Sequence, residues 1–234
     1  MRSKFIHIIL LILSFCVHHS VHTFGTSITV PYPYPMFKQC DGEGLWKNEI
    51  IDTKTLCAAG SFVTSLAMAL SGAGLRIPVT STSMTDVSVS LSAPNLTNSS
   101  SFTSVKTEPA NPKTLVTWLR NNVGTGGLDN VIESIVPRIE PYRITWPGDG
   151  MHRTNDVPFE SLVSYLEKGR IVIGNVNRVV AKGIRGGEHF VLIVGYSSDS
   201  DTLAVNDPTY DVDTYSYQFD FMGYRIFDIE FVRD

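Results

Sequence analysis

The sequence has few cysteines and histidines, and it lacks any run of basic residues. It contains three cysteines and six histidines in 234 residues, with a formal net charge of −4. Because lysine and arginine are not clustered, the sequence argues against a nucleic-acid partner. After the N-terminal apolar segment no apolar run of membrane length follows, so we expect no stable membrane insertion. No internal repeat is present.

The first 25 residues have the features of a secretory leader. A basic start precedes an apolar run from Phe5 to Val17, which is too short to span a bilayer, and Gly25 offers a small residue for cleavage. A membrane anchor is the alternative. We expect residues 1–25 to be a signal peptide, residues 26–234 to form one domain, and the protein to be secreted, extracellular or lumenal in the secretory pathway.

Removal of this leader would leave few residues for covalent or metal chemistry. Cys40 and Cys57 would be the remaining cysteines, and His152 and His189 the remaining histidines. Two histidines exclude a metal site with three histidine ligands in one chain. The acidic stretch at residues 207–213 does not have the spacing of an EF-hand loop. We therefore expect neither a metal nor a cofactor.

Apolar patterns predict helices in the first part of the chain and strands in the last third. Apolar residues on nearly all sides predict a central buried helix at about residues 60–71. Further helices are expected within residues 111–122, 127–137 and 155–169, with Pro137 ending the second of these. Strands are expected in "RIVIGNV", "HFVLIVGY", "DTLAVND" and "YRIFDIEFV", with a loop at residues 180–188 between the first two. This order predicts an α+β fold whose helical part packs on a C-terminal antiparallel sheet.

Serine and threonine dominate residues 79–108. This segment carries two acceptor sequons, at Asn95 and Asn98. We expect an exposed, mobile and glycosylated loop insertion, because such a composition buries little apolar surface. Period-two alternation in "DVSVSLS" leaves a set of short edge strands as the alternative.

A candidate catalytic group emerges from the ends of the predicted strands. His189 follows two glycines and opens the strand "HFVLIVGY", and Asn206 and Asp207 end the next strand. If the two strands form a hairpin, either of these two residues can reach the imidazole and orient it. Ser61 stands at the start of the buried helix, where the helix dipole favours a nucleophile, although a serine there is commonly a helix cap.

Five motifs in this order resemble those of the C39-like peptidases, which are cysteine peptidases with a papain-like fold. They are Gln39 with Trp46, followed by "GSFVTSLAMAL", "NPKTLVTWL", "GGEHFVLIVGY" and "NDP", and they extend over residues 38–227. The resemblance implies Gln39 as the oxyanion donor, His189 as the base and Asp207 as the orienting residue. The family's nucleophilic cysteine falls at Ser61.

Serine in place of cysteine weakens the implied site. A thiol has a pKa of about 8.5 and ionises near neutral pH beside a histidine and a helix dipole, whereas serine must lose its proton during the attack itself. Cys57 precedes Ser61 by about one helical turn, or ~6 Å, which would misalign it with the histidine. Two cysteines in a secreted chain favour a Cys40–Cys57 disulfide, which would tie the Gln39 loop to the nucleophile turn. A free, reactive Cys57 is the alternative.

Three functions fit these features. We favour a secreted pseudoenzyme of the C39-like peptidase fold, inactive or weakly active, that binds a peptide or protein ligand in its cleft. The first alternative is an active peptidase or amidase that uses Ser61, His189 and Asp207, with Gln39 in the oxyanion hole. The second is a glycosylated extracellular scaffold or surface protein without cleft function.

Overall fold

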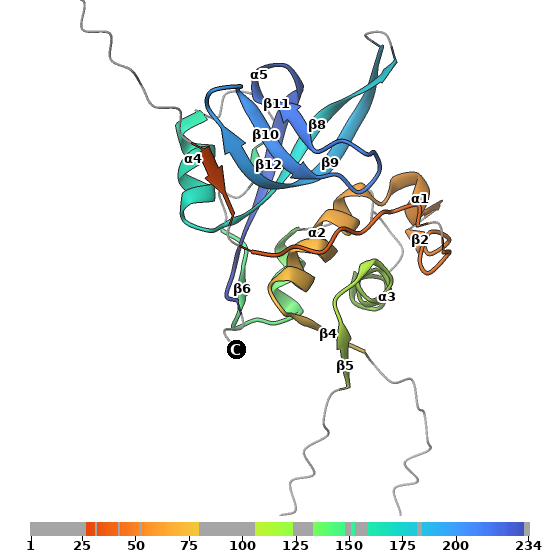
Figure 1. Ribbon diagram of the computed structural model, residues 1–234. Helices are drawn as coiled ribbons and strands as arrows, with labels where there is room; N and C mark the ends of the chain where they lie inside the picture. Colours follow the sequence, from red (N-terminus) through yellow and green to blue (C-terminus); the bar gives the residue numbers. More distant parts are fainter. Residues whose placement is uncertain are drawn as a thin grey trace, which may run out of the picture.

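The computed structural model describes residues 27–30, 32–41, 43–51, 53–79, 106–123, 133–147, 151–152, 159–181 and 184–231. These residues form a mixed α+β structure around one eight-stranded antiparallel sheet (Figure 1). The predicted signal peptide and both sequons, Asn95 and Asn98, lie outside the described residues. Secretion and glycosylation therefore stay predictions.

Two helices of twelve residues, α2 and α3, stand out among shorter ones. The helices are α1 (Leu56–Ala59), α2 (Ser61–Gly72), α3 (Pro112–Val123), the 3-10 helix η2 (Glu133–Arg138), α4 (Phe159–Glu167) and α5 (Tyr217–Asp220). The strands are β1 (Ser27–Thr29), β2 (Ile50–Ile51), β3 (Lys54–Thr55), β4 (Arg76–Pro78), β5 (Thr107–Pro109), β6 (Ile144–Thr145), β7 (Met151–His152), β8 (Ile171–Ala181), β9 (Ile184–Ser197), β10 (Thr202–Asn206), β11 (Thr214–Ser216) and β12 (Phe221–Ile229).

The large sheet has the strand order β11-β10-β9-β8-β12-β6, with β1 added to β9 and β7 to β12. Two small pairs, β2-β3 and β4-β5, lie apart from it. In the second pair, Ile77 lies opposite Glu108, so the two ends of the Ser/Thr-rich segment run side by side. Residues 107 and 108 were expected in a loop and belong to β5 instead, while residues 80–105 lie outside the described part.

The two faces of the sheet contribute to different hydrophobic cores. Val172 and Val191 pack with Leu162 of α4. Ile173 and Leu192, one residue further along each strand, pack with the buried residues of α2 and α3. This alternation is the period-two pattern of a sheet covered on both faces. In Figure 1, α2 lies between the sheet and α3.

The central helix was predicted correctly. Every residue of α2 from Phe62 to Leu70 is buried, as expected for a helix that is apolar on nearly all sides. Gly60 separates α1 from α2, and a Cβ atom there would lie 2.4 Å from the Leu56 carbonyl oxygen. The tight junction that places Ser61 at the helix start therefore requires glycine at position 60.

Several predicted boundaries in the second half of the chain were wrong. The expected loop at residues 180–188 is mostly strand, since β8 extends to Ala181 and β9 starts at Ile184. His189 therefore lies inside β9, opposite Val176, and not at the strand's mouth. The 3-10 helix η2 includes Pro137 instead of stopping before it. His152 lies in the short strand β7, which pairs with β12 and was not among the expected strands.

Candidate active site

Ser61 contacts the strand that carries His189. Its hydroxyl oxygen accepts a hydrogen bond from the Phe190 amide at 3.3 Å, and one turn later the Ser65 hydroxyl donates to the Phe190 carbonyl at 3.2 Å. The reason lies in the sheet: β10 ends at Asn206, opposite Leu192, so Phe190 extends past the neighbouring strand. The hydroxyls of Ser61 and Ser65 therefore hydrogen-bond the amide and the carbonyl of Phe190, which have no partner in β10.

His189 and Asp207 form a buried hydrogen-bonded pair. His189 Nε2 lies 2.9 Å from Asp207 Oδ1, and the two side chains are 5% and 0% exposed. Because β10 runs antiparallel to β9, the chain that leaves Asn206 passes the residues before Leu192 and brings Asp207 beside the imidazole. Of the two orienting residues that the sequence left open, the structure places Asp207 against His189. His189, expected at the opening of its strand, is instead buried within β9.

Further donors hold the Asp207 carboxylate in its ionised form. Oδ1 accepts the amides of Thr209 at 2.7 Å and Tyr210 at 2.9 Å, and Oδ2 accepts the hydroxyl of Tyr215 at 2.7 Å. Burial acts to raise the pKa of Asp207, but the hydrogen bonds from His189, Tyr210 and Tyr215 outweigh it and hold the pKa below its ordinary value. An ionised carboxylate only accepts, so His189 Nε2 carries the proton and Nδ1 is the other ring nitrogen available to act as a base.

Gln39 is hydrogen-bonded both to α1 and to the turn after β10. Its Nε2 donates to the Cys57 carbonyl at 2.7 Å, and its backbone amide donates to the Pro208 carbonyl at 2.8 Å. The side chain is buried, and within the described residues its Oε1 has no hydrogen-bond partner. An amide nitrogen carries two hydrogens, of which the Cys57 carbonyl takes one.

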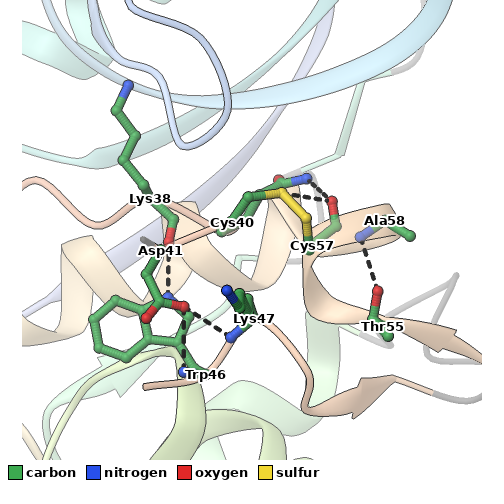
Figure 2. The surroundings of a disulfide bond; sticks show 9 residues. Lys38, Cys40, Asp41, Trp46, Lys47, Thr55, Cys57 and Ala58 are labelled. Carbon is green, nitrogen blue, oxygen red and sulfur yellow. Dashed lines mark hydrogen bonds between the residues drawn. A yellow bond between two sulfur atoms is a disulfide. The ribbon is translucent and has the colours of Figure 1, made fainter. Parts of the chain in front are cut away.

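The Cys40–Cys57 disulfide expected from the sequence is present (Figure 2). It joins the residue after Gln39 to α1, the short helix that precedes Ser61. A free Cys57 nucleophile is thereby excluded in this state of the chain. The structure thus ties together the two segments that carry Gln39 and Ser61.

A compact loop supports this side of the site. The Asp41 carboxylate accepts the backbone amides of Leu45, Trp46 and Lys47, and Figure 2 shows the contacts with the last two. Burial acts to raise the pKa of Asp41, but these three amides and the charge of Lys47 lower it overall. Trp46, part of the family motif, donates from Nε1 to the Lys38 carbonyl at 2.7 Å.

Sequence reasoning missed two residues of this region, Tyr215 and Lys38. Tyr215 reaches Asp207 because β11 folds back onto β10, with Leu203 opposite Tyr215. Lys38 contacts the turn after β10 from the other side. Neither residue stands in a recognisable motif, and the short spacing between residues 207 and 215 was the only signal in the sequence for the first contact.

Two kinds of site are not found in the described part of the chain. No group of three or more histidine, cysteine or acidic side chains there is arranged to hold a metal ion. No helix there has both the length and the apolar character needed to cross a bilayer.

The model of the Peptidase C39-like family matches residues 33–227. The chain belongs to this family. The match includes Gln39, Ser61, His189 and Asp207, and it confirms the resemblance that the five motifs indicated. A search of curated proteins returned no match to the chain. The role of each of the four residues is a proposal.

Proposed function

We propose that this C39-like protein is a secreted pseudoenzyme that binds a peptide segment at the Gln39–Ser61–His189 site and has lost most or all peptidase activity. The observation that carries the proposal is the position of Ser61, which opens α2 beside the strand of His189. The resemblance to the family implies a cysteine at this position. The Cys40–Cys57 disulfide supports an oxidising, extracellular or lumenal compartment.

The chemistry of serine supports loss of hydrolysis. A cysteine at a helix N-terminus beside a histidine exists largely as the thiolate, which attacks without a simultaneous proton transfer. A serine hydroxyl needs a base that removes its proton as the new bond forms. In addition, the Phe190 amide donates to Ser61 Oγ, which occupies one of the two lone pairs of the hydroxyl oxygen and withdraws electron density from it.

The remaining groups support binding of a peptide carbonyl. The second Nε2 hydrogen of Gln39 and the backbone amide of Ser61, at the N-terminus of α2, are donors of the kind that form an oxyanion hole. Both are fixed in place, Gln39 by its bonds to Cys57 and Pro208 and Ser61 by the helix. Donors that bind a developing oxyanion also bind a ground-state carbonyl, although less tightly.

An active peptidase or amidase is the second candidate, and the His189–Asp207 hydrogen bond favours it. In that reaction Ser61 Oγ attacks the carbonyl carbon while His189 Nδ1 takes the hydroxyl proton. Gln39 and the helix amide bind the oxyanion. His189 then gives the proton to the leaving amine, and water hydrolyses the acyl-serine by the reverse sequence. A scaffold function without a ligand at this site is the third candidate.

A paired activity assay separates these functions. The parent chain, Ser61→Cys and Ser61→Ala are expressed through the secretory pathway and incubated with a broad peptide library. We expect no cleavage by the parent or by Ser61→Ala, and cleavage by Ser61→Cys. Cleavage by the parent that Ser61→Ala abolishes would establish the serine hydrolase instead.

Binding is tested on the same library without turnover. The parent should retain a subset of peptides, and Gln39→Ala and His189→Ala should each weaken that retention by roughly tenfold, the loss of one hydrogen bond. Peptide retention that neither variant changes, or no retention at all, would contradict binding at this site and leave the scaffold function.

A further inference from the structure

Lys38 joins the Gln39 segment to the turn that follows β10. Its Nζ donates to the carbonyl oxygens of Asp207 at 3.0 Å and Tyr210 at 2.5 Å, and it lies 3.1 Å from the carboxylate of Asp211. Lys38 and Asp207 are 169 residues apart in the sequence. One side chain thus links two distant segments, each of which carries a residue of the candidate site.

The two carbonyl contacts define the position of this lysine more than the ion pair does. Asp211 is 100% exposed, and an ion pair with an exposed partner contributes little because water screens it. The Lys38 side chain is 32% exposed, so most of it lies against the protein. An ammonium group has three donors, and here the carbonyls of Asp207 and Tyr210 and the carboxylate accept from it.

The backbone beside this lysine is held on both sides as well. The Lys38 carbonyl accepts a hydrogen bond from Trp46 Nε1, which attaches Lys38 to the Asp41 loop, the loop of residues 41–47. The backbone amide of the next residue, Gln39, donates to the Pro208 carbonyl. The segment therefore lies between the Asp41 loop and the turn of residues 207–211.

The disulfide and Lys38 hold Gln39 relative to different partners. The Cys40–Cys57 bond fixes Gln39 relative to α1 and thereby to Ser61. It makes no direct link to the turn after β10, where Asp207 lies. The Gln39 amide, through Pro208, and the Lys38 side chain, through Asp207 and Tyr210, supply that second link. Carbonyl binding by Gln39 and proton transfer by His189 need a fixed spacing, and an error of about 1 Å in such spacing is costly.

We propose that Lys38 is a positioning residue that sets the spacing between Gln39 and the His189–Asp207 pair. This inference rests on the proposed function, because the spacing matters only where one ligand contacts both groups. Lys38 itself does not touch the ligand; it acts through the backbone of Asp207 and Tyr210.

The test is a measurement on the ligand-free chain by nuclear magnetic resonance. The signals followed are the Gln39 side-chain amide and the His189 Nε2 proton, recorded well below the Tm of each variant. In Lys38→Met, which keeps the length of the side chain and removes its donors, we expect roughly tenfold faster solvent exchange of the His189 Nε2 proton. We also expect the Gln39 amide signals to shift or broaden.

Two further variants serve as rescue and control. Lys38→Arg keeps a cation that reaches carbonyl groups and should return both signals close to those of the parent. Lys113→Met removes a lysine whose Nζ lies 3.6 Å from Glu49, away from the turn, and should leave both signals unchanged.

A lower Tm in Lys38→Met with both signals as in the parent would overturn the inference, because the lysine would then stabilise the fold without positioning the site. If Lys38→Met does not fold, Lys38→Gln, whose shorter neutral side chain cannot make all three contacts, is judged by the same two signals. Since no ligand or turnover enters this measurement, its failure is distinct from failure of the proposed function, which the library assays decide.

Discussion

At the scale of single residues, the state of Asp207 decides what His189 can do. Its carboxylate accepts from His189, from two backbone amides and from Tyr215. These donors keep Asp207 ionised in a buried place, and the ionised form holds the histidine in the tautomer with the proton on Nε2. Burial, together with the bond to Asp207, in turn raises the pKa of Tyr215, so the phenol remains a donor.

Tyr215→Phe should destabilise the protein in a pH-dependent way. The pKa of Asp207 is lowered in the folded state, so its contribution to stability is present above the unfolded pKa of about 3.9 and is lost as the pH falls through the folded pKa. Removal of one donor makes that lowering smaller. We expect a loss of about 1–2 kcal/mol at pH 7 that shrinks as the pH falls below about 4.

Urea unfolding from pH 7 down to pH 2 measures this difference. Tyr142→Phe, at a position that is 92% exposed, is the matched control and should follow the parent at every pH. If the loss in Tyr215→Phe stays constant over the whole range, the hydroxyl does not act on the ionisation of Asp207.

The residues of the site differ in how far the sequence predicted them. His189, Asp207 and Gln39 stand in motifs whose order along the chain predicted that they belong to one site. The expectation of a secreted chain with two cysteines predicted the disulfide. Tyr215 and Lys38 contribute through tertiary contacts across a turn, and such contacts leave no local pattern. The burial of His189 was missed for the same reason, since it depends on how far β9 extends and on what packs beside it.

At the scale of elements, the junction between α1 and α2 places Ser61. Gly60 closes α1 by donating its amide to the Leu56 carbonyl at 2.7 Å, and α2 begins at the next residue. A Cβ atom at position 60 would lie 2.4 Å from that carbonyl oxygen and 2.5 Å from Leu56 Cδ1. The first of these neighbours is backbone, which cannot move without displacing the junction.

Gly60→Ala should therefore lower stability and displace Ser61 from the His189 strand. We expect a loss of about 2 kcal/mol, within the range of overpacked sites. Ala58→Ser, at an exposed position of α1, is the control and should change stability by less than about 0.5 kcal/mol. Thermal unfolding measures both, and an unchanged Tm in Gly60→Ala would contradict the steric argument.

Strand ends were the least predictable part of the fold. The glycines at positions 186 and 187 favour a loop by local propensity, yet the pairing of β8 with β9 continues past them, with Val179 opposite Arg185. Pairing across a hairpin outweighs the preference of single residues. The two-residue strands β2 and β3 are too short to give an alternating pattern at all.

At the scale of the whole molecule, the disulfide joins the N-terminal segment to the helical part. It closes a loop with a sequence separation of 17, for which the chain-entropy account gives a stabilisation of about 3 kcal/mol. Cys40 is exposed, so a dithiol reductant has access to the bond.

Reduction with excess dithiothreitol should therefore lower the Tm. It should also make the segment that carries Gln39 more mobile relative to α1. For a domain of this size, about 3 kcal/mol corresponds to a decrease of roughly 6–12 °C. The double variant Cys40→Ser/Cys57→Ser should match the reduced parent and should not respond to the reductant. A Tm that is the same with and without reductant in the parent would show that the disulfide does not stabilise the fold.

The α+β arrangement was predictable because helical patterns precede strand patterns along the chain. Apolar patterns predicted a buried helix, further helices and an antiparallel sheet, whereas the position of α3 on the outer side of α2 (Figure 1) depends on tertiary contacts. The same arrangement brings the start of α2, the middle of β9 and the end of β10 to one place. The proposed site rests on that convergence.

The most direct test of this account is the rate at which an electrophilic thiol probe labels Ser61→Cys at neutral pH. Ser71→Cys, near the other end of α2, is the control for an ordinary thiol. We predict that Ser61→Cys labels at least tenfold faster, because the histidine and the helix dipole together generate the thiolate. His189→Ala in the same chain should remove most of the difference and leave only the contribution of the helix dipole. Equal labelling of the two cysteine variants would show that the site is not an intact cysteine-peptidase frame.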